Sequence, residues 1–151
     1  MRTLSIRQPL VLLITRPDLK TPAERAEALA RDLMKPVENR DWATPWRGEF
    51  LIHAGVGLVQ RDYIECATYL RDEMGIELPD FRDQQQVPRC GIVGVATLVD
   101  CVVDHPSRFF TGPHGLVLAN ARPLPFVPWK GQLGWFDVPR SAVGLPALEV
   151  A

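Results

Sequence analysis

The chain has 151 residues, of which 46% are hydrophobic and 23% charged, a composition typical of a soluble globular domain. Seventeen Lys and Arg against eighteen Asp and Glu give a net charge of −1, which excludes a protein that coats long stretches of nucleic-acid backbone by bulk charge. The longest uninterrupted run of large aliphatic residues, Leu10–Ile14, is far shorter than the roughly 18 residues of a membrane-spanning helix, and no export signal follows Met1. We therefore expect one domain over residues 1–151, located in the cytoplasm and without a membrane partner.

A short strand at Leu4–Arg7 is followed by a helix that begins near Thr21. Thr21 is a suitable N-cap, Pro22 suits the first helical position and Glu24 completes a capping box. The apolar residues that repeat at helical spacing, and form the expected packing face, are Ala26, Leu29, Ala30 and Leu33. The charged residues assigned to the exposed face of this helix are Glu24, Arg25, Glu27 and Arg31.

Two strands and a second helix are expected in the middle of the chain. The strands are Val37–Trp42 and Glu49–His53. The helix runs from about Gln60 to Met74, where Gly75 supplies a C-terminal stop. Its predicted apolar stripe consists of Ile64, Ala67, Leu70 and Met74. The following segment, Glu77–Arg89, is expected to be one exposed loop.

The last third of the chain is rich in strand signals and in proline. The apolar run Gly91–Val103 is too long for one flat half-buried strand, and its glycines predict a bend. Shorter strands are expected at Gly115–Asn120 and Leu133–Val138. The prolines, densest between Pro106 and Pro146, argue against long regular elements there. Six short strands and two main helices together predict an α+β fold.

Cysteine and histidine usage gives no sign of a metal centre. Cys66, Cys90 and Cys101 are odd in number and lack C-x-x-C spacing, a pattern typical of reduced thiols. Only three histidines accompany them, and His105 and His114 lie beside prolines in expected loops. We therefore predict no metal site and no cofactor.

Three segments in a fixed order carry a family resemblance: Leu4–Pro9, Lys35–Trp42 and Arg47–Ala54. Together they resemble the ASCH domain family, a branch of the PUA-like β-barrels. Gly91–Val95 and Trp129–Gly134 are similar to the family's middle and closing strands. The resemblance implies a PUA-like mixed β-barrel of about six short strands with two or three flanking helices.

The chain departs from this family pattern in two places. Residues 16–33 exceed the family's usual spacing and are predicted to be a helical insertion. The family's G-x-K motif is altered at Met34–Lys35, so Met34 has to suit the local backbone without the conformational freedom of glycine.

The strand predicted at residues 37–42 carries the centre of the candidate site. Alternate residues of a strand share a face, so Glu38, Arg40 and Trp42 project together, with Lys35 just before them. A glutamate accepts from the amino edge of a base, an arginine holds a phosphate or stacks, and a tryptophan offers a platform. The alternative is a surface ion pair on a strand. The resemblance favours the nucleobase pocket.

The turn at Arg7 and Gln8 is expected at the same cleft, as the resemblance implies. Gln8 could read a base edge through its amide, and Arg7 could meet Glu38 or a phosphate. The alternatives are a backbone cap for Gln8 and a structural salt bridge for Arg7. His53 alternates in phase with Leu51, which predicts an inward side chain with either an acid–base or a structural, hydrogen-bonded role.

Trp129 and Lys130 lie immediately before the closing strand, where Gly131 permits close backbone approach. The functional interpretation is base stacking by Trp129 and phosphate capture by Lys130. The alternative is that Trp129 plugs the end of the barrel and Lys130 is solvated. Trp135 is expected to be packed.

The sequence supports two functions from different classes. The first is a module that binds RNA, or a nucleotide or nucleoside with or without a modification, in this cleft. The alternative, implied by the resemblance, is a small amidohydrolase acting on 4-acetylcytidine, or else a ribonuclease. Its candidate catalytic residues are Lys35, which would stabilise the oxyanion, and Glu38, which would activate water. Glu38 stands where that branch of the family has a threonine. The oligomeric state is not predicted.

Overall fold

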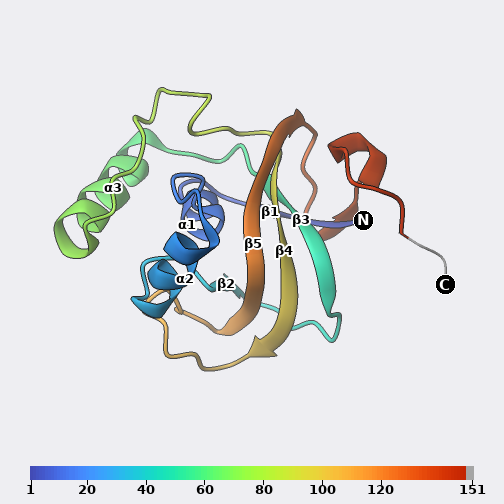
Figure 1. The fold of residues 1–151 in the computed structure, drawn as a ribbon, viewed down its shortest axis with the longest axis horizontal. Helices are drawn as coiled ribbons and strands as arrows, with labels where there is room; N and C mark the ends of the chain where they lie inside the picture. Colours follow the sequence, from blue (N-terminus) through green and yellow to red (C-terminus); the bar gives the residue numbers. More distant parts are fainter. Residues whose placement is uncertain (149–151) are drawn as a thin grey trace.

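Residues 1–148, which the computed structural model describes, contain six strands in one sheet that curls into half a barrel (Figure 1). The order across the sheet is β2-β5-β4-β3-β1-β6, in which β1 runs parallel to β3 and the other neighbouring pairs are antiparallel. The α+β class is therefore confirmed, and each predicted strand overlaps an observed one. The strands are β1 (Arg2–Ile6), β2 (Val37–Arg40), β3 (Gly48–Ala54), β4 (Gly91–Val102), β5 (His114–Pro128) and β6 (Trp135–Asp137).

Strand β3 buries side chains on both of its faces. Phe50 and Ile52 pack in a cluster that includes residues of α1 (Leu10–Thr15), whereas Leu51 packs in a second cluster with Phe136. Successive side chains of a strand point to opposite faces, so one apolar run serves two clusters. A short 3-10 helix, η1 (Arg140–Val143), contributes Val143 to the second cluster.

The predicted bend of β4 is confirmed by three register shifts along its pairing with β5. At Gly94 the chain has no room for a side chain, because a Cβ atom would lie 2.7 Å from Cγ2 of Thr15 and 2.8 Å from the carbonyl oxygen of Arg122. Glycine at this position lets α1 approach the sheet closely.

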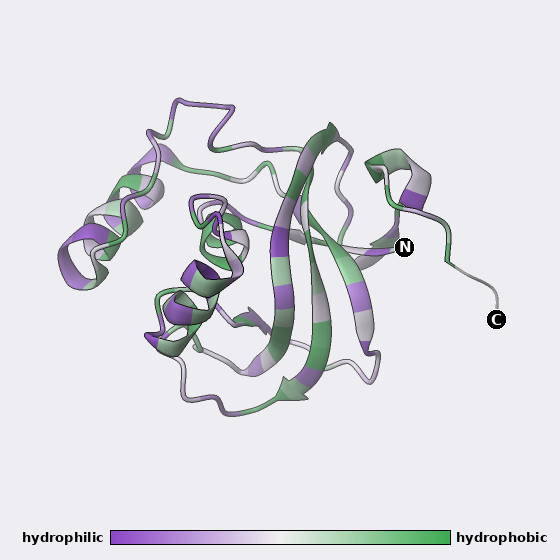
Figure 2. Cartoon of the chain, viewed as in Figure 1, coloured by the Kyte–Doolittle hydropathy of each residue, from purple (hydrophilic) through white to green (hydrophobic). Residues whose placement is uncertain are grey.

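The expectation that prolines exclude long elements near the C-terminus is wrong. β5 has 15 residues and includes Pro123, Pro125 and Pro128. β2 pairs only with His114–Val117, so the proline-containing half of β5 has a free edge on that side, where no ladder hydrogen bond is lost. In Figure 2, hydrophilic and hydrophobic bands alternate along β5, as expected for a strand with one exposed face.

The helix α1 was not expected from the sequence. Its residues from Val11 to Thr15 are all buried, so the segment carries no amphipathic pattern. Val11 and Ile14 join the cluster around Phe50, while Leu13 packs toward α3 (Gln60–Met74). In Figure 1, α1 lies between the sheet and α3.

Helix α3 has the predicted bounds and ends at Gly75, which adopts φ 66°. Its predicted stripe is wrong at one position, because Ile64 is 50% exposed and Tyr63 is 2% exposed. Tyr63 faces the loop that follows the helix, and its hydroxyl donates to the carbonyl of Pro79 at 2.7 Å. Among residues 1–148, no helix combines the length and the apolar character that crossing a membrane requires.

Helix α2 (Pro22–Ala30) begins as predicted, with Thr21 Oγ1 accepting from the amide of Glu24 at 3.1 Å. Its predicted packing face is wrong. Leu29 is 47% exposed, and Ala28 is the buried residue of the helix. Arg25, predicted on the exposed face, instead turns toward the body of the domain and donates to backbone carbonyls. The helix is attached mainly by polar contacts because it has few large apolar side chains.

Replacing Tyr63 by Phe should change the pH dependence of stability above pH 10. Burial, with smaller effects of Cys66 and Asp80, raises the pKa of the Tyr63 phenol from 10.0 to about 12. Its stabilising contribution is therefore complete below pH 10. It is lost as pH rises toward 12, because only the unfolded state ionises in that window. In urea titrations, the difference in unfolding free energy between wild type and Tyr63→Phe should shrink by about 1 kcal/mol per pH unit above pH 10.

Tyr69→Phe is the matched control, since Tyr69 lies on the same helix and is 58% exposed. A difference between wild type and Tyr63→Phe that stays constant from pH 8 to 11 would contradict this account.

Candidate functional site

Three predicted site residues meet at edge strand β2, and we call Lys35, Glu38 and Arg40 the seam cluster. The Lys35 ammonium donates to Glu38 Oε2 at 3.0 Å and to the carbonyl of Val37 at 2.6 Å. Arg40 Nε lies 3.6 Å from Glu38 Oε1. Lys35 is only 2% exposed and Glu38 only 5%. The carboxylate is thus held between two cations in the interior.

Burial lowers the pKa of Lys35, because the charged ammonium loses hydration, and the Glu38 carboxylate opposes this effect. The Lys35 amide donates to the carbonyl of Leu13, which ties this residue to α1. Met34 just before it is buried, and the positive φ in this segment falls on Asp32, at 55°. Met34 therefore needs no glycine-like conformation.

Arg40 connects the two edges of the curled sheet. β6 pairs with β1 only from Arg2 to Leu4, which leaves the carbonyl of Ser5 on an open edge. Arg40 Nη2 donates to that carbonyl at 2.8 Å. β2, which carries Arg40, is the opposite edge strand. The guanidinium also lies 5.9 Å from the ring of Trp42, which follows the strand and packs edge-on against Trp135.

His53 has a structural environment. Its Nε2 lies 2.7 Å from the carbonyl oxygen of Trp129 and its Nδ1 lies 2.9 Å from Ser5 Oγ. A carbonyl can only accept, so Nε2 carries a proton, and in the neutral ring Nδ1 accepts from the serine hydroxyl. The ring is 1% exposed, and a Cβ at Gly131 would lie 2.7 Å from its Cε1. This geometry favours the hydrogen-bonded alternative over acid–base work.

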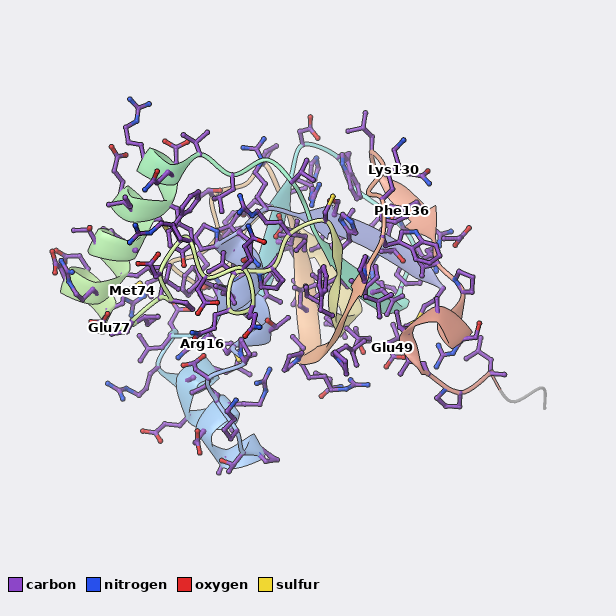
Figure 3. All side chains as sticks on the ribbon, turned by 90° about the horizontal axis from the view of Figure 1, so that it is seen from above. Arg16, Glu49, Met74, Glu77, Lys130 and Phe136 are labelled. Atoms are coloured by element: carbon purple, nitrogen blue, oxygen red, sulfur yellow. The ribbon has the colours of Figure 1, made fainter. Side chains whose placement is uncertain are left out.

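The remaining predicted residues lie apart from the seam cluster. Trp129 is half-buried against the cluster of Leu51, and Lys130 is exposed. Figure 3 shows Lys130 beside Phe136, on the side of the molecule opposite Arg16. Arg7 is exposed, and its side chain makes no hydrogen bond or ion pair with any other residue in the range 1–148.

A cavity of about 560 Å³ lies beside Gln8, and we call it the Gln8 cavity. α1, the loop after α3 and the end of β5 surround it. Buried apolar residues such as Leu12 and Val93 line it, together with the half-exposed Phe126. Gln8 itself is 3% exposed, and its Nε2 donates to the carbonyl of Pro88 at 2.8 Å. Its Oε1 is buried and accepts no hydrogen bond from the described residues.

Arg16 and Asp18, which the sequence analysis missed, also line this cavity. Arg16 donates twice to Asp18, at 2.9 and 2.8 Å, and once to the carbonyl of Leu33. The hydrogen bonds from Arg16 hold the pKa of the Asp18 carboxyl below its usual value. An arginine two residues before an aspartate is a weak sequence sign of an ion pair. Here the two side chains meet because the backbone turns at Arg16, which adopts φ 41°.

The sequence matches no protein-family model and no curated protein. The resemblance to the ASCH family therefore rests on the sequence motifs alone. Over the described range 1–148, no group of three His, Cys, Asp or Glu side chains is placed to hold a metal ion.

Replacing Glu38 by Ala should destabilise the fold strongly. The Lys35 ammonium would stay buried without its counter-charge, and breaking such a pair costs about 3 kcal/mol or more. Urea unfolding measures the loss. The double variant Lys35→Met/Glu38→Leu, which removes both charges, should recover most of it.

Glu27→Ala is the control, since the Glu27–Arg31 pair on α2 spans 3.8 Å with both side chains exposed, and its loss should cost no more than about 0.5 kcal/mol. Equal effects of Glu38→Ala and Glu27→Ala would show that the seam cluster is not a stabilising contact.

Proposed function

We propose that this protein is an ASCH-type, PUA-like module that binds a nucleoside, or one unstacked nucleotide of RNA, in the Gln8 cavity. The order of the three sequence motifs and the curled six-stranded sheet support the PUA-like assignment. The observation that carries the binding proposal is the buried Oε1 of Gln8, which has no partner among residues 1–148 and belongs to a residue lining a cavity.

The size and lining of the Gln8 cavity suit a nucleobase. Its volume of about 560 Å³ lies within the range of small-molecule sites. Leu12 and Phe126 offer apolar surface to a flat ring. The carbonyl of Pro88 fixes the orientation of the Gln8 side-chain amide, because the flipped amide would place Oε1 of Gln8 against the carbonyl oxygen of Pro88. Gln8 Oε1 is therefore the acceptor offered to an amino or ring N–H group of a base, and because this atom is itself buried in the free protein, neighbouring side chains have to shift before the base reaches it.

The energetics also favour a ligand at this position. A buried acceptor without a partner costs about 1–3 kcal/mol, and a donor on the ligand would remove this cost. The charged residues that line the cavity balance, with Arg16 and Lys20 against Asp18 and Glu77. A balanced cavity suits one base or nucleoside better than a run of phosphates, in agreement with the net charge of −1 for the chain.

The amidohydrolase alternative receives less support. It requires Lys35 and Glu38 at a substrate, and the two groups are indeed 3.0 Å apart. Each is almost fully buried and bonded to the other, and neither lines the Gln8 cavity. Their contacts with β2 and α1 support a role in holding the fold.

Replacing Gln8 by Met should weaken ligand binding about tenfold, because one net hydrogen bond is lost while the volume is kept. Each of the four ribonucleosides and a short single-stranded RNA would be tested by thermal shift and calorimetry. At least one should raise the melting temperature of the wild type. Gln132→Met, at an exposed glutamine outside the cavity, should bind as the wild type does.

Failure of the wild type to bind any of these ligands would contradict the proposal, as would unchanged affinity in Gln8→Met. Incubation with 4-acetylcytidine, followed by mass spectrometry, separates the alternative. Deacylation by the wild type that disappears in Lys35→Met/Glu38→Leu would establish the amidohydrolase instead.

A further inference from the structure

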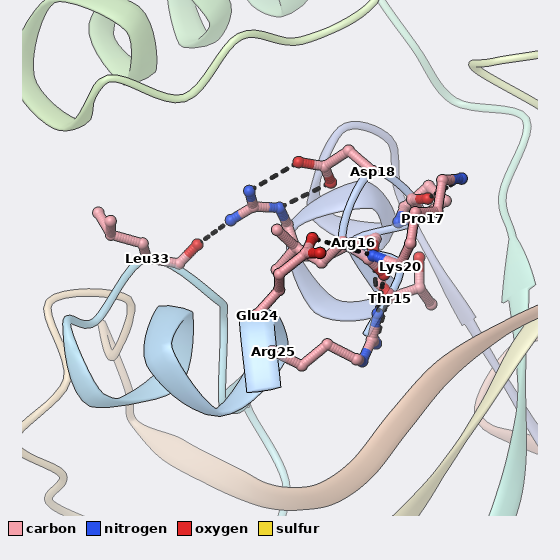
Figure 4. A network of polar contacts seen from close by, with 9 residues as sticks. Thr15, Arg16, Pro17, Asp18, Lys20, Glu24, Arg25 and Leu33 are labelled. Atoms are coloured by element: carbon pink, nitrogen blue, oxygen red, sulfur yellow. Dashed lines mark hydrogen bonds and ion pairs between the residues drawn. The ribbon is translucent and has the colours of Figure 1, made fainter. Parts of the chain in front are cut away.

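Arg25 on α2 makes four hydrogen bonds to main-chain carbonyls. Figure 4 shows its side chain directed at the residues that end α1. Nη1 donates to Arg16 at 3.0 Å and to Leu19 at 3.3 Å. Nη2 donates to Thr15 at 2.6 Å and to Ala121 on β5. One side chain therefore joins the end of α1, the turn after it, the helix α2 and the sheet.

The segment 16–33 is also anchored at its C-terminal end, where Asp32 accepts from Ser107 Oγ at 2.5 Å and from the amide of Arg108 at 2.7 Å. α2 buries only Ala28 among its residues, so the apolar contribution to docking is small. A second polar contact, from Arg16 to the carbonyl of Leu33, connects the start of the segment with its end. The position of residues 16–20 thus depends on the guanidinium groups of Arg16 and Arg25, whereas Asp32 fixes the other end of the segment.

The same segment supplies one wall of the Gln8 cavity. Arg16, Pro17, Asp18 and Lys20 line it, whereas Arg25 does not. Arg25 binds the carbonyl of Thr15, just before this wall, and those of Arg16 and Leu19 within it. Loss of its bonds would release the wall while leaving Gln8 and the apolar lining in place.

We infer that Arg25 is a positioning residue that holds residues 16–20 as a clamp on the bound base. This inference rests on the proposed function of the Gln8 cavity. A segment held by a few hydrogen bonds opens locally more readily than the core of the sheet. When only the docked state binds, the apparent affinity equals the intrinsic affinity multiplied by the fraction of molecules in which the segment is docked. A bound ligand in turn favours docking.

The test compares Arg25→Gln, Arg25→Lys and Arg31→Gln. Arg31 ends the same helix but is exposed, so Arg31→Gln controls for loss of charge. The probe is a short single-stranded RNA that contains all four bases, with affinity measured by fluorescence anisotropy. Amide hydrogen exchange is followed separately in residues 16–33 and in β3 and β4.

Arg25→Gln should speed exchange in residues 16–33 and leave β3 and β4 unchanged, and it should weaken RNA binding about tenfold. Arg25→Lys, which keeps a donor, should lie between it and the wild type. Arg31→Gln should match the wild type.

Three results would overturn the inference, and they differ. RNA binding of wild-type strength in Arg25→Gln would remove the clamp and leave the proposed function intact. No binding of this RNA or of any of the four ribonucleosides by the wild type would remove the proposed function, and the clamp with it. Faster exchange in β3 and β4 as well would show that Arg25 supports the whole fold and does not position this wall.

Discussion

The incomplete closure of the sheet is the constraint on which the rest of this structure depends. A half-barrel has two free edges and an open interior, and both have to be covered. Arg40 joins the two edges by donating to the carbonyl of Ser5. The carboxylate of Glu38, which is also paired with Lys35, lies beside the Arg40 guanidinium. α1 covers part of the interior, where its Val11 and Ile14 pack in one cluster with apolar residues of the sheet. Charged residues that suit a binding site by type are thereby used to hold the fold.

The same constraint creates the cavity. α1 fills the interior only in part, and the space that remains lies between α1, the loop after α3 and the far end of β5. Gln8 stands at the junction of β1 and α1, with one end of its amide bound to Pro88. Its oxygen is left inside the protein without a partner among residues 1–148. Unsatisfied buried acceptors are uncommon in folded proteins, which makes this the most informative polar atom of the site.

Much of the fold could be predicted, because it depends on local patterns. The six strand signals, the Thr21 N-cap and the Gly75 stop all correspond to observed features. α1 was missed because a helix buried on all sides has no apolar stripe, and its run resembles a buried strand. Arg25 was wrongly predicted to be exposed, because it lies on the charged face of the helical pattern. The carbonyls that it binds, those of Thr15 and Ala121, lie in other segments of the chain.

The sequence by itself determined the α+β class, the strand positions and the adjacency of Lys35, Glu38 and Arg40, because each follows from spacing of a few residues. Only the tertiary structure decided which polar groups are bonded internally and which are left without a partner among residues 1–148. Glu38 and His53 are saturated by partners that the fold brings to them, whereas Gln8 keeps one free acceptor. That difference arises from hydrogen bonds and burial between segments far apart in the chain, which no local pattern encodes.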